Sequence, residues 1–419
     1  MAIFGRNVPY LVSRSRSVGA RYGVTSVRAK NRVQRCVGTL QPHGLLPTFA
    51  TPGRVIEEEP SFFRRLSDDG AEFAVHGYDH VDFRKISRAD ATSQFARALD
   101  AYRRAGVACD GFRCPYLSFT PELVGTWPEG AFSYSSNRAV AWRAAALDAD
   151  NPVFAQLAKF YAAVSAEEEV SLPSTSGPVV EIPCSVPDDL ELFDGLSLGE
   201  QGMLDAWLDV LHEVHRRGEL FAPLFHPESF DLMQGPIEDL LEAAARLQPS
   251  VWLAQLRDVA RWWQEKSAFT ARASAHTGGL RIELHCTERA TVLVRDWPRP
   301  VDARPWDGRW SVLDARTAEV AAPIRPFIGV IGRDRETVAF LTEVGYIVDD
   351  GATAGECTLV LDGAVRSRVE LIRHIEESEG PLLRFSSWPS ETKSALCLAG
   401  DLDALSLRDY ARRLVPHRQ

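Results

Sequence analysis

Residues 45–80 read LLPTFATPGRVIEEEPSFFRRLSDDGAEFAVHGYDH, and this stretch decides the class of fold. It begins with a short apolar run that Pro52-Gly53 ends, continues in a pattern that predicts a helix closed by Gly70, and returns to the apolar strand EFAVHG. A strand, a helix and a second strand favour a parallel α/β sheet or barrel, in which functional sites gather at the carboxyl ends of strands. We therefore expect His76 to lie at such an end.

Helices and short strands keep alternating until the pattern changes near residue 269. The expected helices cover residues 87–106 (capped by Ser87 and Asp90), about 199–217, 236–247 and 250–266. After residue 269, short alternating stretches separated by Gly, Pro and Asp predict a β-sandwich-like module. We divide the chain into the main part of a distorted (β/α) barrel, this β-rich module, a small α/β segment, and a C-terminal strand and helix that complete the barrel: residues 1–268, 269–325, 326–380 and 381–419.

The composition excludes several functional classes. Of 419 residues, 45% are hydrophobic and 25% are charged, which is typical of a folded soluble protein. The formal charge is −10, from 57 acidic and 47 basic residues, so neither nucleic acid nor an anionic membrane is an expected partner. The seven cysteines are scattered without a CxxC pair, and no stretch resembles a signal peptide or an integral membrane segment. We expect a cytoplasmic protein.

Three short pieces place histidine or arginine at or just after a strand end. His76 and His80 are four residues apart, so that one turn of helix aims both imidazoles at one ion. Arg113-Cys-Pro-Tyr116 combines a permanent charge with a backbone that proline fixes. His226 ends an apolar run and could be an acid or base. Taken singly, the pieces are weak evidence: the spacing of His76 and His80 often arises by chance, the Arg113 piece is only suggestive, and His226 could as readily be a core histidine.

A fourth piece lies close to the C-terminus. Gly400-Asp401-Leu-Asp403-Ala404 follows the apolar strand of residues 394–399. Two carboxylates at the end of a buried strand are costly unless they bind a metal or transfer protons, because like charges raise each other's pKa. A turn followed by a helix cap is the alternative explanation. Together the four pieces supply an acidic pair, two histidines at ligand spacing, an arginine and a further histidine, all near strand ends.

These pieces resemble the motifs of the polysaccharide deacetylase (NodB-homology) family of metal-dependent carbohydrate esterases. The family's H-[S/T]-x-x-H motif is similar to residues 76–80, its R-x-P-Y motif to residues 113–116, and its L-x-H motif to residues 224–226. The run FSYSSN at 132–137 resembles a further piece usually found downstream of the second of these. Their order and spacing agree with the family over about residues 27–230.

The family's first motif, an acidic T-F-D-D or F-D-x-D, is missing from its usual place, because SRSRSVGARYG contains no acid. The C-terminal run RFSSWPSETKSALCLAGDLDAL resembles that motif instead. We therefore interpret the chain as circularly permuted, with its last strand and helix completing a barrel that begins near residue 20. Chain ends of compact domains often lie close together, so such a barrel can close.

The resemblance implies a divalent metal, with Zn²⁺ the expected ion, held by Asp403, His76 and His80. Three protein ligands leave open positions for water and substrate, as a hydrolytic zinc site needs. Gly77 departs from the family pattern, which has Ser or Thr at this position. In the family that hydroxyl helps to order the loop, and this chain lacks it.

The resemblance also implies the catalytic roles. Asp401 would act as general base and Arg113 would orient it, while the Tyr116 backbone amide would stabilise the tetrahedral oxyanion. His226 would protonate the leaving amine. The implied reaction removes an N-acetyl or related acyl group from an amino sugar.

The family's fourth motif, an acid that tunes the histidine or the arginine, has no clean counterpart, and Asp188 or Asp189 is the expected one. Since we expect a cytoplasmic protein, its glycan or small-molecule substrate would be made inside the cell, such as a nucleotide-linked or lipid-linked amino sugar for polysaccharide biosynthesis. The β-rich module is expected to pack on the barrel rather than to hold glycan.

Two alternatives remain open at this point. One is a hydrolase of cyclic or linear amides on the same fold that does not act on carbohydrate. The other is a catalytically inactive homologue that serves as a glycan-binding or scaffold module, which gains support if Asp403 lies far from His76 and His80. The oligomeric state is not indicated by the sequence.

Overall fold

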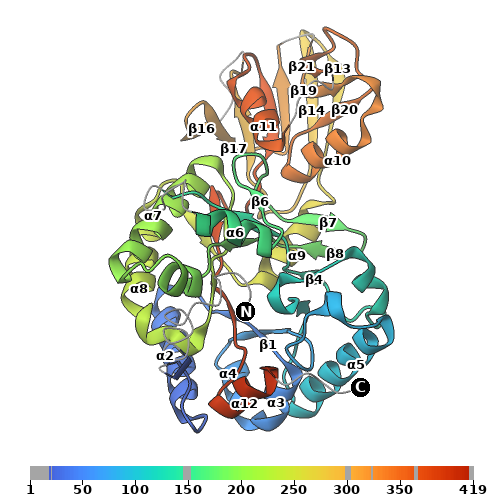
Figure 1. Ribbon diagram of the computed structural model, residues 1–419. Coiled ribbons are helices and arrows are strands. Elements are labelled where there is room, and N and C mark those ends of the chain that lie inside the picture. Colours follow the sequence, from blue (N-terminus) through green and yellow to red (C-terminus); the bar gives the residue numbers. More distant parts are fainter. Residues whose placement is uncertain are drawn as a thin grey trace.

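The structure, a computed structural model, describes residues 18–19, 21–144, 152–297, 303–321, 324–362 and 367–414, and its largest sheet is curled and flanked by helices (Figure 1). The strand order is β11-β24-β1-β2-β3-β4-β8-β7, and all neighbours run parallel except β7 and β8. The expected α/β class with a distorted barrel is confirmed. The strands are Thr48–Thr51 (β1), Glu72–Val75 (β2), Gly111–Phe112 (β3), Tyr134–Ser135 (β4), Ser174–Ser176 (β7), Val179–Glu181 (β8), Leu224–Phe225 (β11) and Ala399–Asp401 (β24).

The C-terminal strand β24 lies inside this sheet, between β1 and β11. Asp401 is level with Ala50 of β1, and Gly400 is level with Phe225 of β11. Glycine at position 400 allows a close fit, because a Cβ there would lie 3.0 Å from the Pro227 ring and 3.1 Å from the Phe225 ring. The parallel register brings the carboxyl ends of β11, β24 and β1 to one edge of the sheet.

Two short parallel sheets continue the barrel wall. Their orders are β10-β23-β12 and β6-β5-β9. The run 394–399, which the sequence predicts as one strand, is divided between sheets, because the Cys397 N–H donates to Phe221 whereas the Leu398 carbonyl accepts from Thr48. The strands are Ala139–Ala141 (β5), Val164–Ser165 (β6), Cys184–Val186 (β9), Leu220–Phe221 (β10), Val251–Leu253 (β12) and Ser394–Leu396 (β23).

Helices cover the outside of the barrel (Figure 1). The capping box expected at residues 87–106 is present, with the Ser87 hydroxyl accepting from the Asp90 N–H at 3.1 Å. In the described part of the chain, no helix has the length and apolar character needed to cross a membrane. The barrel helices are Val27–Leu40 (α2), Gly53–Glu58 (α3), Pro60–Asp68 (α4), Arg88–Ala105 (α5), Pro152–Phe160 (α6), Glu200–Arg217 (α7), Gln234–Arg246 (α8), Leu256–Lys266 (α9) and Leu407–Leu414 (α12).

Two expected helices differ in the structure. The segment up to Gly70 forms α3 and α4 instead of one helix, because Pro60 has no N–H to continue the ladder and Glu59 leaves helical geometry with φ −136°. The segment 250–266 begins as strand β12, which includes Trp252, and becomes helical only at Leu256. Pairing of β12 with β23 is a contact between distant parts of the chain, which local sequence patterns do not reveal.

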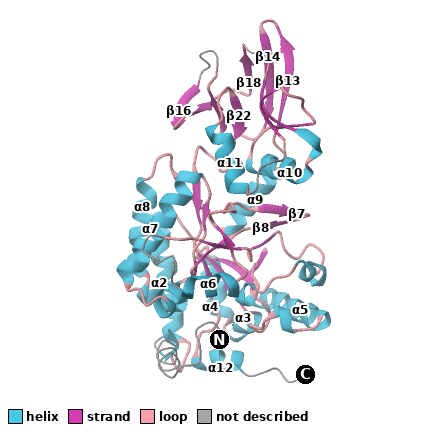
Figure 2. Ribbon diagram, turned by 45° about the horizontal axis from the view of Figure 1, so that its top comes forward, coloured by secondary structure: helices cyan, strands magenta, loops and turns pink. Residues whose placement is uncertain are grey.

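The β-rich module stands beyond one end of the barrel in both views (Figures 1 and 2). Its antiparallel sheets are β13-β14-β18 and β16-β17-β15-β22, and we include in it the expected α/β segment of residues 326–380, whose parallel sheet is β20-β19-β21. Its elements are Thr270–His276 (β13), Gly279–His285 (β14), Val292–Arg295 (β15), Ala303–Asp307 (β16), Trp310–Leu313 (β17), Thr317–Val320 (β18), Arg325–Val330 (β19), Val348–Asp350 (β20), Cys357–Leu361 (β21), Leu382–Phe385 (β22), Arg335–Val344 (α10) and Arg368–Glu377 (α11).

The strand β22 was expected with the barrel, as part of residues 381–419. It pairs instead with β15 of the module, in the register Val292↔Phe385 to Arg295↔Leu382. Leu383 and Phe385 share an apolar core with Val292 and Val294. Burial of these alternating apolar side chains explains the placement, and the chain returns to the barrel only at β23.

Candidate active site

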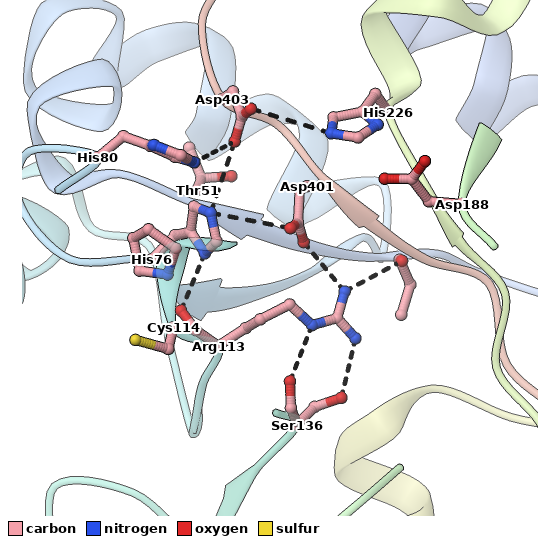
Figure 3. A network of polar contacts seen from close by, with 12 residues as sticks. Thr51, His76, His80, Arg113, Cys114, Ser136, Asp188, His226, Asp401 and Asp403 are labelled. Carbon is pink, nitrogen blue, oxygen red and sulfur yellow. Dashed lines mark hydrogen bonds and ion pairs between the residues drawn. The ribbon is translucent and has the colours of Figure 1, made fainter. Parts of the chain in front are cut away.

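The side chains of interest lie at the carboxyl edge of the curled sheet (Figure 3). His76 follows β2, Arg113 follows β3, His226 follows β11, and Asp401 ends β24. All four are buried, with exposed fractions of 6% or less. Parallel strands therefore bring together groups that stand up to 325 positions apart in the sequence.

His76, His80 and Asp403 form a compact group with the donor set of a metal site. The Asp403 Oδ1 atom lies 3.2 Å from His80 Nε2 and 3.5 Å from His76 Nε2. His76 Nδ1 lies 2.9 Å from the Arg113 carbonyl, so Nδ1 carries the hydrogen and Nε2 presents its lone pair to the group. His76 Nε2 and Asp403 Oδ1 are buried atoms without a hydrogen-bond partner, which is costly unless a cation binds them. The residues thus fit a divalent cation.

The two histidines are presented by a loop, not by the turn of helix that their spacing suggested. Gly77 has φ +72°, and a Cβ there would lie 2.9 Å from the Asp79 carbonyl oxygen, so any other residue would strain the loop. The Gln94 side chain accepts from the N–H groups of Tyr78 and Asp79, at 3.0 and 2.8 Å. Gln94 therefore orders the loop that lacks a Ser or Thr hydroxyl.

Asp401 lies beside this group and is held by Arg113. Arg113 Nη1 donates to Asp401 Oδ1 at 3.0 Å and to the Ala399 carbonyl at 3.1 Å. The rest of the guanidinium donates to the Ser136 carbonyl and hydroxyl, at 3.1 and 2.8 Å. Ser136 belongs to the FSYSSN run. The second carboxylate oxygen of Asp401 lies 3.8 Å from His76 Nε2, on the side of the group formed by His76, His80 and Asp403.

His226 pairs with Asp189 rather than Asp188. Its Nδ1 atom lies 2.7 Å from Asp189 Oδ1, and its Nε2 atom lies 3.9 Å from Asp403 Oδ2. Burial and the Arg21 charge oppose protonation, but Asp189 outweighs them and raises the pKa of His226 to about 9. The imidazole is therefore a cation near neutral pH, which suits a proton donor.

Asp188, the other expected acid, has a carboxylate oxygen within 4.8 Å of a His226 ring nitrogen but makes its hydrogen bonds elsewhere. It accepts from the Tyr161 hydroxyl at 3.1 Å and from the Glu191 N–H at 2.8 Å. Burial raises the pKa of Asp188 to about 6 and holds the pKa of Glu191 well above its usual range. Asp188 thus stabilises the segment that presents Asp189.

Tyr116 has a left-handed backbone, with φ +60°, in a short 3₁₀ turn spanning Pro115–Leu117. Its ring packs edge-on against the His80 ring, with centroids 4.5 Å apart. The residue therefore lies beside the group formed by His76, His80 and Asp403, as its place in the sequence motif suggested.

Arg413 of the terminal helix α12 also reaches the group, and sequence reasoning missed it. Its Nη1 donates to Asp403 Oδ2 at 2.7 Å, and its Nη2 lies 3.0 Å from both ring nitrogens of His80. Burial and the Arg413 charge lower the pKa of His80 to about 4, so this imidazole is neutral at physiological pH. Despite burial, Arg413 and His80 hold the pKa of Asp403 well below its usual range.

A second missed set comes from the start of the described chain. Arg21 and the Tyr22 hydroxyl donate to the same Glu228 oxygen, at 2.8 and 2.7 Å, and all three residues are buried. Glu228 stands two positions after His226, and that spacing was the one signal available. Arg21, Tyr22 and Arg413 approach the site only through tertiary packing, for which no motif exists.

Comparison with known protein families gives a match to part of the chain. The family model described as polysaccharide deacetylase matches residues 23–126, which include His76, His80, Arg113 and Tyr116. This stretch of the chain is therefore similar to polysaccharide deacetylases. No curated protein sequence matches the chain.

Solved structures that are similar to parts of the chain include a candidate polysaccharide deacetylase from Mycobacterium smegmatis, with 20% identity, covering 61% of this chain and 83% of that one, at a TM-score of 0.43. The Puue allantoinase is 16% identical, with coverage of 56% and 72% and a TM-score of 0.43. A family 4 carbohydrate esterase from Streptomyces lividans, solved with acetate, is 17% identical, with coverage of 51% and 81% and a TM-score of 0.29. At these values the similarities assign no activity to the chain.

Proposed function

We propose that the protein is a metal-dependent deacylase that removes an N-acetyl or related acyl group from an amino sugar. The observation that carries the proposal is the position of the Asp401–Asp403 pair. Asp403 lies 3.2 and 3.5 Å from the two histidines, and Asp401 is fixed beside them by Arg113 at 3.0 Å. Metal-assisted hydrolysis can use one carboxylate that binds the cation and a second carboxylate, held in a fixed orientation, that accepts a proton from water.

His76, His80 and Asp403 would hold the cation, and Zn²⁺ suits two imidazoles and one carboxylate. When bound there, the cation would polarise the acyl carbonyl and make water more acidic. Neutral imidazoles and an ionised Asp403 are the protonation states that such binding needs, and the low pKa values of His80 and Asp403 agree with this.

The remaining residues would move the protons. Asp401, oriented by Arg113, takes a proton from the attacking water as its oxygen bonds to the acyl carbon. The Tyr116 backbone amide stabilises the developing oxyanion. His226, which Asp189 keeps protonated, delivers a proton to the nitrogen as the C–N bond breaks. The products are a carboxylate and a free amine.

The substrate belongs to this proposal as well. The family match favours an amino sugar, and a nucleotide-linked or lipid-linked amino sugar of polysaccharide biosynthesis is the expected form. The proposed site uses no residue of the module that begins near 269. The position of β24 between β1 and β11 supports the interpretation that the chain is circularly permuted, because the motif at its C-terminus completes the site.

The test uses the purified full chain with N-acetylglucosamine oligomers and, in parallel, with allantoin. Zinc-dependent release of acetate, lost in His76→Ala, is the expected result. Conversion of allantoin to its ring-opened acid, without release of acetate from the oligomers, would favour an amide hydrolase that does not act on carbohydrate. Binding of the oligomers with neither reaction would instead favour an inactive glycan-binding protein.

A further inference from the structure

The terminal helix α12 is attached to the barrel at several points, and one of them lies in the proposed metal site. The Leu407 N–H donates to the Gly23 carbonyl at 2.9 Å, and the Tyr410 ring lies 5.3 Å from the Tyr22 ring. Arg412 pairs with Glu58 on the outer side of the helix. Arg413 turns inward instead, with 13% of its side chain exposed.

Arg413 contacts two of the three proposed metal ligands, Asp403 through Oδ2 at 2.7 Å and the ring nitrogens of His80 at 3.0 Å. A neutral imidazole has one acceptor nitrogen, and a guanidinium has donors only. If His80 accepts from Arg413 through Nε2, the lone pair that faces Asp403 is already in use.

The other tautomer gives the same result. If Nδ1 accepts from Arg413, then Nε2, which lies 3.2 Å from Asp403 Oδ1, carries the hydrogen and has no lone pair for a cation. A metal on Nε2 would move that hydrogen to Nδ1, where it would face the donor groups of Arg413. In both tautomers, metal ligation by His80 is incompatible with its present contact to Arg413. The positive charge of Arg413 adds repulsion between two cations close together in a buried site.

We propose that Arg413 and the divalent cation compete for His80 and Asp403, so that metal binding releases the end of α12 from the active site. This inference rests on the proposed function, because it needs His76, His80 and Asp403 to be metal ligands. The arginine acts as a built-in counter-ion that neutralises Asp403 until the metal displaces it. The attachment of helix α12 then depends on whether a cation occupies the site.

Zinc affinity is the first test, measured on the full chain by competition with a chromogenic chelator. Arg413→Gln should bind zinc about tenfold more tightly than the wild type. This factor is expected if Arg413 contacts His80 and Asp403 in about nine-tenths of the wild-type molecules without zinc. Arg412→Gln is the matched control, because it removes the neighbouring charge from the same helix and should leave the affinity unchanged. Equal or weaker zinc binding by Arg413→Gln would overturn the inference.

Hydrogen exchange of residues 407–414 is the second test, and it does not depend on activity. Zinc should speed exchange in the wild type, whereas in Arg413→Gln exchange should be fast with and without zinc. Unchanged exchange on zinc addition to the wild type would show that Arg413 stays in place and would refute the competition. A His76→Ala variant should bind zinc weakly and show no zinc effect. If the wild type binds no zinc at all, the proposed metal site itself fails, and the inference fails with it.

Discussion

The Asp401–Arg113 pair allows a sharp test of the proposed general base. Asp401→Asn keeps the shape of the side chain and an oxygen for Arg113, but removes the carboxylate charge. At 3.0 Å and an effective dielectric constant of about 20, the attraction between the two charges is about 5 kcal/mol. The loss of stability should be smaller, about 3 kcal/mol, because Arg113 keeps its bonds to Ser136 and Ala399. Turnover should fall by about 10²–10⁴-fold, since no carboxylate remains to accept the proton.

Three measurements on Asp401→Asn separate the possible roles. Acetate release gives turnover, urea unfolding gives the free energy of unfolding, and elemental analysis gives zinc content. The variant should keep its zinc, whereas Asp403→Ala, the control at the ligand two positions away, should lose it. Near wild-type turnover of Asp401→Asn would refute its role as the base, and loss of zinc would show that Asp401 is a ligand.

Three further predictions concern other parts of the site. In Asp189→Asn the pKa of His226 should fall from about 9, so the alkaline decline of turnover should begin at least about one pH unit lower. The raised pKa also contributes stability that is present below pH 6.5 and lost as the pH rises through about 9, so unfolding of Asp189→Asn should depend less on pH across this window. An unshifted pH–rate profile would exclude His226 as the proton donor. Gly77→Ala should lower the free energy of unfolding by about 1–2 kcal/mol in urea titrations. Gly130→Ala, with φ +68° and open space around its Cβ, should cost less, and equal losses would show that the clash with Asp79 is unimportant. Removal of metal with a chelator should abolish acetate release and added zinc should restore it, whereas full activity after chelation would contradict the proposed metal dependence.

Much of the fold could be predicted because local patterns report local structure. The alternation in residues 45–80 predicted β1, β2 and the helical segment between them, and Ser87 with Asp90 marked the start of α5. The errors arose where long-range pairing overrode the local pattern. β12 forms because β23 lies beside it, and β22 joins β15 because both bury apolar side chains in the module.

The candidate site was predictable to the extent that its residues occur in short motifs. His76 and His80, Arg113, and Asp401 with Asp403 were chosen on spacing and on their places near strand ends. The choice between Asp188 and Asp189 could not be predicted, because adjacent residues differ only in the direction of their side chains. In the structure it is Asp189 that bonds to His226. Arg413 carried no signal, since the Arg-Arg pair of a terminal helix usually faces solvent.

The sequence by itself determined the residue types, and thus the chemistry that the chain can perform: carboxylates and imidazoles as ligands and proton carriers, and a permanently charged arginine to orient one of them. Only the tertiary structure decided which of these groups meet. β24 enters the sheet beside β1, which places Asp403 of the last twenty residues 3.2 Å from His80. The physical reason is that parallel pairing and burial act on strands irrespective of their separation along the chain, whereas a sequence motif reports only near neighbours.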